Sequence, residues 1–329
     1  MSSNTPRVSI IIAFYKNEKY LRECLEHCLR LDYPNYEIIV VSARQIKLDS
    51  RVKHVIVNSE AQGIKKNAGV ATSSGDLCAF IDDDAYPDKE WLKNAVKYFT
   101  DPHIGAVCGP GVTPPGDGIK QKASGAIYSS FIGSGPLRYR YIPTKVQYVD
   151  MAPGYNIIIR CSLLKKIGGF KSNLRSGEDD LISAEILKMG KKILYAPDVI
   201  VYHHRRPLFI PHLRQVMNYG LHRGFFMKKY SQTSTKLIYF LPFIAIVSVG
   251  SILPLVIYYT IIGASLVFQI FGFVVGAYLA TSFISAYKIS KDMRVALLAM
   301  IGTPLTHLVY ALGFIKGLLT RSIGERPSY

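Results

Sequence analysis

The sequence predicts an α/β fold with a mostly parallel, Rossmann-like central sheet, followed by interfacial amphipathic helices and C-terminal transmembrane helices. Three observations lead to this prediction. Short apolar runs such as Val8–Ala13 and Leu77–Ile81 alternate with helical segments, as expected for buried parallel strands. The stretch 237–287 contains no charged residue. Between these parts, 205–236 mixes apolar and basic residues, a pattern typical of helices at a membrane surface.

The expected elements of the first part follow one another in alternating order. A strand at 8–13 leads through the loop Phe14–Glu18 into a helix. Ligands of doubly wound sheets bind beyond the carboxyl ends of the strands, so this loop is expected to line a ligand site. Further strands are expected at 36–41, 54–57, 77–81 and 104–108, and helices at 19–31, 62–74, 89–100, 119–131 and 181–189.

The strand at 77–81 ends in three adjacent carboxylates, Asp82-Asp83-Asp84, followed by a Tyr-Pro turn. Burying three adjacent acids costs much free energy unless a cation compensates their charge. Hard oxygen ligands in this position suit Mg²⁺ or Mn²⁺, which in turn hold substrate phosphates. The alternative is a solvated Asp-rich turn without a ligand.

Upstream of this strand lie Gly63-Ile64-Lys65-Lys66-Asn67-Ala68-Gly69 and a Gly75-Asp76 turn. A G-x-x-x-N-x-G helix, a Gly-Asp turn and an apolar strand ending in D-x-D, in this order, resemble glycosyltransferase family 2. The resemblance covers roughly the first two-thirds of the chain. It implies a GT-A fold, a nucleotide-sugar donor and a divalent metal ion.

The resemblance also implies which residues contact the donor. In the family, the loop after the first strand contacts the base and ribose, which corresponds here to Ala13, Tyr15 and Glu18. As an alternative, Glu18 is an ordinary acid in the first turn of a helix. Asp82 and Asp83 are expected to contact the nucleotide sugar as well.

Lys65 and Lys66 stand near a helix N-terminus, where donor phosphates are favoured. The family usually has arginine at position 66, and lysine supplies a point charge without the bidentate fork. Lys66 is therefore expected at the phosphates, whereas Lys65 either joins it or lies in solvent.

The second strand is followed by Ser42-Ala43-Arg44-Gln45, where the family usually has an acidic turn with an Asp that holds uracil. The missing acid argues against a uridine donor and leaves guanosine or another base open. Mannose from GDP-mannose is one candidate donor, although a UDP-sugar remains an alternative.

Met151–Arg160 and Gly168-Gly169-Phe170 match the family's acceptor side, and Glu178-Asp179-Asp180 opens the next helix. The family places its catalytic base in this acidic pair. An inverting transfer needs one carboxylate that removes a proton from the acceptor hydroxyl. We assign this role to Asp179, with Glu178 and Asp180 as neighbours that position it or the acceptor. The alternative is that these acids only stabilise a helix N-terminus.

A strand ending in Tyr202-His203-His204 supplies a further candidate metal ligand. Relatives carry a histidine here as a third ligand or a diphosphate contact. His203 is preferred, because strand alternation places it opposite Tyr202, and His204 stays open. The expected metal ligands are therefore Asp82, Asp84 and His203, with Mn²⁺ or Mg²⁺ as the ion. Packed histidines without a metal are the alternative.

The uncharged stretch 237–287 is 51 residues long, which is enough for two membrane crossings of about twenty residues each. Spans are expected at about 237–259 and 263–287, and a third at 295–315 either crosses, re-enters or lies along the interface. Lysines on both flanks place both ends in the cytoplasm. The expected domains are 1–204 (GT-A), 205–236 (interfacial helices) and 237–329 (transmembrane), in a multi-pass protein of the cell membrane with a cytoplasmic catalytic domain.

The net charge of +17 is concentrated near the apolar stretch, since no Asp or Glu occurs from Val199 to Lys291. This placement favours an anionic membrane surface over nucleic acid as the partner. Gln215-Val216-Met217-Asn218-Tyr219 resembles a degraded Gln-x-x-Arg-Trp motif of cellulose synthases, so the architecture is similar to a minimal form of those enzymes. The degraded motif argues against processive transfer.

Five cysteines without a C-x-x-C motif predict reduced, buried thiols. Together these observations predict an inverting hexosyltransferase that moves one sugar from a nucleotide-sugar to a polyprenyl or dolichyl phosphate, or to a lipid-linked glycan such as those of N-glycan biosynthesis. The alternatives are a processive polysaccharide synthase and an inactive membrane scaffold with the same fold.

Overall fold

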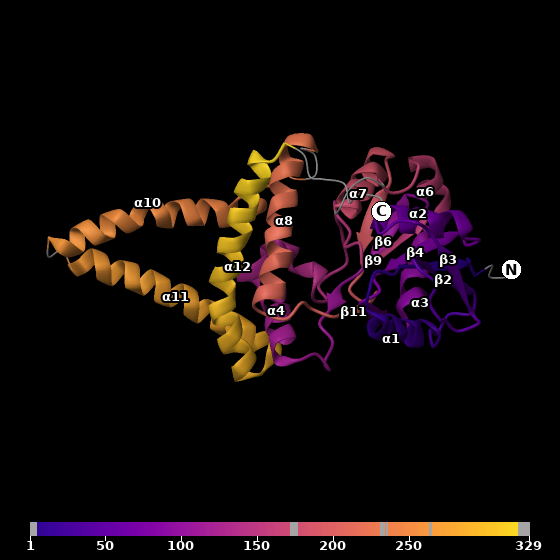
Figure 1. The fold of residues 1–329 in the computed structure, drawn as a ribbon, viewed down its shortest axis with the longest axis horizontal. Helices are drawn as coiled ribbons and strands as arrows, with labels where there is room; N and C mark the ends of the chain where they lie inside the picture. Colours follow the sequence, from indigo (N-terminus) through magenta and orange to yellow (C-terminus); the bar gives the residue numbers. More distant parts are fainter. Residues whose placement is uncertain (1–4, 172–176, 231–233, 235, 263–264, 322–329) are drawn as a thin grey trace. The chain divides into compact units, whose positions relative to one another are not determined.

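The computed structural model describes residues 5–171, 177–230, 234, 236–262 and 265–321 (Figure 1). Residues 263 and 264, at the start of the expected second span, lie outside these residues. The chain divides into two compact units. Residues up to 114 form the first unit together with 139–204. Residues 115–138 and the chain from Arg205 onward form the second, although the sequence analysis assigned 115–138 to the catalytic domain.

The first unit is built on an eight-stranded sheet with the order β3-β2-β1-β4-β9-β6-β10-β8. Four of the seven pairings between these described strands are parallel, and β9 runs antiparallel to both β4 and β6. The expected mostly parallel α/β sheet is thus present, with one reversed strand at its centre. The strands are β1 (Val8–Ala13), β2 (Tyr36–Ser42), β3 (Val52–Ile56), β4 (Leu77–Ile81), β6 (Ile104–Cys108), β8 (Gln147–Tyr148), β9 (Asn156–Arg160) and β10 (Lys192–Tyr195).

Helices cover both faces of this sheet. Figure 1 shows α2, α6 and α7 over one face and α1 and α3 over the other. Helix α1 begins after Asn17, whose side chain caps the helix by accepting hydrogen bonds from the backbone N–H groups of Lys19 and Tyr20. The helices are α1 (Glu18–Cys28), α2 (Gln62–Thr72), α3 (Trp91–Val96), α6 (Cys161–Ile167) and α7 (Glu178–Lys188).

A second, three-stranded sheet extends the first unit beyond the end of β4. It consists of β5 (Ala85–Pro87), β11 (Val201–His203) and β7 (Gly111–Val112), with β11 in the middle. The antiparallel pairing of β11 with β5 sets His203 opposite Ala85. This register places His203 next to the carboxylates that follow β4.

The helix with the G-x-x-x-N-x-G motif and the turn Gly168-Gly169-Phe170 contact each other through Asn67. The side-chain amide of Asn67 donates to the Phe170 carbonyl and accepts from the Phe170 N–H, both at 2.8 Å. Gly169 has φ +79°, and a Cβ there would lie 2.4 Å from Asn67 Oδ1. These residue types are therefore required to dock the Gly-Gly-Phe turn onto α2.

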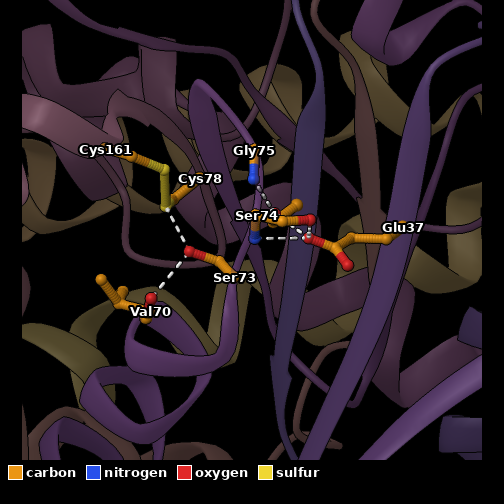
Figure 2. Close-up of a disulfide and its surroundings, with 8 residues drawn as sticks. Glu37, Val70, Ser73, Ser74, Gly75, Cys78 and Cys161 are labelled. Carbon is orange, nitrogen blue, oxygen red and sulfur yellow. Dashed lines mark hydrogen bonds between the residues drawn. A yellow bond between two sulfur atoms is a disulfide. The ribbon is translucent and has the colours of Figure 1, made fainter.

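Cys78 and Cys161 form a disulfide, so the prediction of reduced thiols is wrong for these two residues (Figure 2). The reason is the reversed strand. Because β9 runs antiparallel to β4, it pairs Leu77 with Arg160 and thereby leaves Cys161, the first residue of α6, beside Cys78. Their Cα atoms lie 5.6 Å apart, within the ordinary range for a disulfide. The remaining cysteines, Cys24, Cys28 and Cys108, are free and buried.

The second unit is helical. Among the described residues, the helix segments Leu266–Ser290 and Met293–Leu319 are long and apolar enough to cross a membrane. A further helix, α10, contains no charged residue. Ile127 of α4 and Ala299 of α12 lie in one buried apolar cluster, which also contains Leu208. The helices are α4 (Ile119–Ser129), α5 (Phe131–Ser134), α8 (Ile210–Lys229), α10 (Leu241–Ile261), α11 (Ser265–Ser290) and α12 (Met293–Leu319).

Candidate active site

Asp82, Asp84 and His203 converge where β4 ends. One ligand atom from each of these side chains lies within 4.8 Å of the others. The closest pair is His203 Nε2 and Asp84 Oδ1, at 3.0 Å. The turn that follows β4 carries the two carboxylates, and the pairing of β11 with β5 places the imidazole beside them. The sequence analysis named the same three residues as the metal ligands.

The neighbouring histidine points elsewhere. His204 Nε2 lies 3.0 Å from Glu23 Oε2, and its ring stacks on Tyr20 at a centroid distance of 4.3 Å. Tyr20 and Glu23 both belong to helix α1. His203 therefore faces the carboxylates after β4, whereas His204 faces α1.

The donor atoms of this group fit a divalent cation. Two carboxylates and one imidazole are a ligand set that Mn²⁺ accepts and that Mg²⁺ accepts less readily through nitrogen. Burial raises the pKa of Asp82, Lys66 opposes this effect, and the charge of Asp84 adds to it. A cation placed among these side chains would favour the ionised form of both carboxylates.

Asp83 has a different environment from its two neighbours. Its Oδ2 atom accepts a 2.8 Å hydrogen bond from the backbone N–H of Tyr15, in the loop after β1. Asp83 thus holds this loop against the end of β4, while Ala13 is buried as the last residue of β1. Both residues were expected to contact the nucleotide sugar. Their placement puts the β1 loop beside the triple-Asp turn.

Glu18 lies at the exposed start of α1 and forms ion pairs with Arg44 at 3.2 Å and Arg22 at 3.7 Å. Arg44 belongs to the segment that replaces the acidic turn of the resembling family. The start of α1 and the segment after β2 are therefore joined by an arginine–glutamate ion pair.

Lys66 is buried and lies between the two groups of acids. Its Nζ atom is 3.1 Å from Glu178 Oε1. Burial by itself lowers the pKa of Lys66, but the carboxylates of Glu178, Asp82 and Asp179 outweigh it, so the net pKa is raised. Lys66 is therefore a permanent cation that interacts with the carboxylates on both sides of the site.

Lys65 is fully buried, so the alternative that it lies in solvent is wrong. It donates to the Phe14 carbonyl at 2.7 Å and pairs with Glu60 at 2.6 Å. These contacts fix Phe14, the residue before Tyr15. They also hold the ammonium group of Lys65 at Phe14 and Glu60 and not at the acids after β4. Lys65 supports the β1 loop.

The acids at the start of α7 differ in exposure. Glu178 and Asp180 are buried, whereas Asp179 is partly exposed. Asp179 Oδ2 accepts a 3.2 Å hydrogen bond from the Gly154 N–H and lies 3.6 Å from a guanidinium nitrogen of Arg140. A carboxylate with one bonded oxygen and partial access to solvent is well placed to accept a proton.

Two residues that the sequence analysis did not select connect these parts. The ring of Tyr155 packs on His203 at 4.5 Å, and its hydroxyl donates to the Arg140 carbonyl at 2.6 Å. Arg140 in turn pairs with Asp179. Tyr155 stands in the acceptor-side motif and Arg140 in the basic aromatic stretch 137–148, but nothing in either pattern distinguishes them from their neighbours.

A family model matches part of the chain, and several known proteins are similar to it. The model of Glycosyl transferase family 2 matches residues 9–168. Glycosyltransferase AglE of Haloferax volcanii is 27% identical over 228 residues, which cover 63% of this chain and 70% of AglE. A Methanococcus voltae enzyme is 23% identical over 242 residues, covering 68% of this chain and 74% of that enzyme. It is named dolichyl N-acetyl-alpha-D-glucosaminyl phosphate 3-beta-D-2,3-diacetamido-2,3-dideoxy-beta-D-glucuronosyltransferase.

Among solved structures, the mannosyltransferase PcManGT of Pyrobaculum calidifontis, in complex with GDP-Man and Mn²⁺, matches with a TM-score of 0.63 and 19% identity. The match covers 92% of this chain and 88% of that one, and it shows a shared fold. The fold, the family match and the order of the motifs agree. Residues 9–168 of the chain therefore form a glycosyltransferase family 2 domain with the GT-A fold.

Proposed function

We propose that the protein is a metal-dependent, inverting hexosyltransferase of the membrane, which moves one sugar from a nucleotide-sugar to a lipid-linked acceptor. The observation that carries the proposal is the convergence of Asp82, Asp84 and His203 at the end of β4. Lys66 links this group to Glu178 and Asp179 through its charge. A cation site and a candidate base thus belong to one electrostatic cluster, as a transfer from a diphosphate requires.

The residues divide the chemistry between them. Asp82, Asp84 and His203 would hold Mn²⁺ or Mg²⁺, which supplies positive charge to the donor diphosphate. When the acceptor is a sugar hydroxyl of a lipid-linked glycan, Asp179 removes its proton as the acceptor oxygen bonds to the anomeric carbon. A polyprenyl or dolichyl phosphate attacks through a phosphate oxygen that is already ionised, so this acceptor needs no base. The bond from the anomeric carbon to the diphosphate oxygen breaks at the same time, and the nucleoside diphosphate leaves with the electron pair. Attack from the face opposite the leaving group inverts the anomeric configuration.

The neighbouring residues position these groups. The Gly154 N–H and Arg140 hold Asp179 in place, and Asp83 fixes the β1 loop through Tyr15. Glu178 keeps Lys66 beside Asp82 rather than in solvent. Lys66 thereby supplies a fixed positive charge where the departing diphosphate develops negative charge.

GDP-mannose is the donor that we propose. Two observations support it. The uracil-binding acid of the resembling family is replaced here by Arg44 and its neighbours, and the structural neighbour was solved with GDP-Man and Mn²⁺. A UDP-sugar is the alternative that a donor panel would reveal.

A polyprenyl or dolichyl phosphate, or a glycan carried on one, is the proposed acceptor. The dolichyl phosphate in the name of the Methanococcus voltae relative supports this choice. The apolar helices of the second unit support it as well, because a lipid-linked acceptor presents its reactive end at headgroup level. Lysines on both sides of the uncharged stretch favour a cytoplasmic catalytic domain.

A transfer assay tests this function. Detergent-solubilised protein is incubated with polyprenyl phosphate or with a polyprenyl-linked sugar, with Mn²⁺ and with radiolabelled GDP-mannose or UDP-sugars, and the lipid product is counted. We expect one donor to be used. With the sugar acceptor, we expect Asp179→Asn to reduce the rate by about 100-fold or more while it still binds donor. Glu185→Gln on the same helix, where Glu185 pairs with Lys188, is the matched control and should transfer normally. An unchanged rate of Asp179→Asn with the sugar acceptor would remove the base assignment.

A further inference from the structure

Three consecutive residues of the first unit join the two halves of the candidate site to the core. The turn residues Gly154 and Tyr155 lead into Asn156, the first residue of β9. Asn156 is fully buried, and its side-chain oxygen accepts a 2.9 Å hydrogen bond from Trp91 Nε1. Its amide nitrogen donates to two backbone carbonyls, at 3.1 and 2.7 Å. The turn before it is therefore attached to a fixed point of the core.

The ring of Tyr155 packs against His203 and against the backbone of Gly111. Its centroid lies 4.5 Å from that of the His203 imidazole, at an interplanar angle of 35°. Gly111 of β7 leaves space for the ring, because a Cβ there would lie 2.3 Å from Tyr155 Cε2. On its other side, His203 Nε2 faces Asp84 Oδ1 at 3.0 Å. The ring of Tyr155 thus supports the imidazole in the orientation that a metal ligand needs.

The same turn reaches the proposed base by two routes. The hydroxyl of Tyr155 donates to the Arg140 carbonyl at 2.6 Å, and a guanidinium nitrogen of that arginine lies 3.6 Å from Asp179 Oδ2. The Gly154 N–H donates to this same oxygen at 3.2 Å. A Cβ at Gly154 would lie 3.0 Å from the Cβ of Asp179, so the turn and the start of α7 are closely packed.

The two carboxylate oxygens of Asp179 consequently differ. Both routes end at Oδ2, and among the residues that the structure describes Oδ1 has no hydrogen-bond partner. An anchored Oδ2 fixes the direction of Oδ1, whose lone pairs are free to accept a proton. Proton removal requires a carboxylate oxygen within hydrogen-bond distance of the acceptor hydroxyl, and the geometry leaves Oδ1 for this step.

We propose that Tyr155 is a positioning residue for the transfer. Its ring sets His203 for the metal ion, and its hydroxyl, through Arg140, sets Asp179 so that Oδ1 receives the proton of a sugar hydroxyl. Tyr155 itself makes and breaks no bond. The proposal rests on the proposed function and adds that one side chain aligns the metal site with the base. Loss of the hydroxyl should therefore affect the base alone, whereas loss of the ring should affect both.

Two variants separate the hydroxyl from the ring. Tyr155→Phe keeps the ring against His203 and removes the bond to Arg140. We expect its Mn²⁺ binding, followed by electron paramagnetic resonance, and its donor affinity to equal those of the wild type. Its kcat with the sugar acceptor should fall by about 10-fold or more, because a misaligned base slows the transfer step. Tyr155→Leu should in addition weaken Mn²⁺ binding by about 10-fold.

A double variant distinguishes positioning from a general structural effect. If Tyr155 acts through Asp179, then Tyr155→Phe combined with Asp179→Asn should be no slower than Asp179→Asn alone. Tyr195→Phe is the matched control. Tyr195 is fully buried, and its hydroxyl donates to the Ile142 carbonyl at 3.0 Å, in the same stretch as Arg140. This variant should lower the melting temperature at least as much as Tyr155→Phe while its kcat stays at the wild-type value.

The possible failures can be told apart. A wild-type kcat in Tyr155→Phe would overturn the role of the hydroxyl, and wild-type Mn²⁺ binding in Tyr155→Leu would overturn the role of the ring. Losses that multiply in the double variant, or an equal loss in Tyr195→Phe, would show a general structural effect and overturn the proposal. A wild-type protein that transfers no sugar would instead reject the proposed function, and this proposal with it. If Tyr155→Leu does not fold, Tyr155→Met takes its place.

Discussion

Lys66 Nζ lies 3.1 Å from Glu178 Oε1, although the two residues are 112 positions apart in the chain. Both side chains are buried, and the pair joins helix α2 to the start of α7. The same ammonium group interacts with Asp82 and Asp179. This one cation therefore connects the residues that we assign to the donor with those that we assign to the acceptor.

Replacing Lys66 tests this connection. Lys66→Gln leaves Glu178 buried without its cation, which costs about 3 kcal/mol of unfolding free energy, and it should also weaken donor binding by removing positive charge beside Asp82. Thermal unfolding and calorimetric donor titration measure the two effects. Lys66→Arg keeps the charge and should retain most of both. Wild-type donor affinity in Lys66→Gln would show that the ammonium group has no part in binding the diphosphate.

The two adjacent histidines allow a matched test of the metal site. Asp84→Asn and His203→Gln should each weaken Mn²⁺ binding by roughly 10- to 100-fold, because each removes a donor atom from the group after β4. His204→Gln is the control, since His204 bonds to Glu23. The electron paramagnetic resonance signal of free Mn²⁺ reports binding. Equal losses in both histidine variants would contradict the choice of His203.

The expected fold and the acidic motifs could be predicted because they depend on local patterns. Apolar runs mark β1 and β4, and the carboxylates follow directly in the sequence. The pair of Lys66 with Glu178 could not be predicted, because it depends on how distant helices are placed around the sheet. The Cys78–Cys161 disulfide depends in the same way on the reversal of β9, for which an apolar strand carries no signal.

Reduction of this disulfide should destabilise the first unit. Cys78 and Cys161 are 83 positions apart, so the bond closes a long loop in the unfolded chain, and its loss costs about 2–4 kcal/mol. Cys78→Ser and Cys161→Ser should lower the melting temperature by similar amounts and should no longer respond to reductant. Cys108→Ser, at a free and buried cysteine, should keep the response to reductant. A wild-type melting temperature that is the same with and without reductant would argue against the bond.

Glu37 should make stability depend on acidic pH. Burial raises its pKa, but hydrogen bonds from Lys53, Ser9 and Ser74 outweigh burial and lower the pKa of Glu37 to about 2 (Figure 2 shows Glu37 beside Ser74). Because the folded pKa lies below the unfolded one, the stabilisation is complete above about pH 5 and is lost as the pH falls toward 2. It amounts to about 3 kcal/mol.

Glu37→Gln should therefore lower the unfolding free energy at pH 7 and flatten its decline between about pH 5 and 2. Urea unfolding at a series of pH values measures both. Glu26→Gln, at an exposed position of α1, is the control and should follow the wild-type curve. If Glu37→Gln keeps the full wild-type slope, the carboxylate of Glu37 is not the group that titrates.

Two glycines of the second unit should respond in opposite directions to the same change. Gly317→Ala places a Cβ 2.1 Å from the Leu221 carbonyl oxygen, so α8 and α12 must separate and the melting temperature in detergent should fall. Gly276→Ala in α11 meets no atom within 4 Å and should be neutral or stabilising by up to about 1 kcal/mol, because alanine favours the helix. Equal melting temperatures for the two variants would contradict the close packing of α8 on α12.

The central claim is that the group of Asp82, Asp84 and His203 binds a cation that in turn holds a nucleotide-sugar. Isothermal titration calorimetry of GDP-mannose and several UDP-sugars into the detergent-solubilised protein, with Mn²⁺ or with chelator, tests it most directly. We expect one donor to bind in Mn²⁺, to lose its binding heat in chelator, and to bind weakly or not at all to Asp84→Asn in either condition. Binding of the donor that is equally strong in chelator, or unchanged in Asp84→Asn, would contradict the metal site on which the proposed reaction depends.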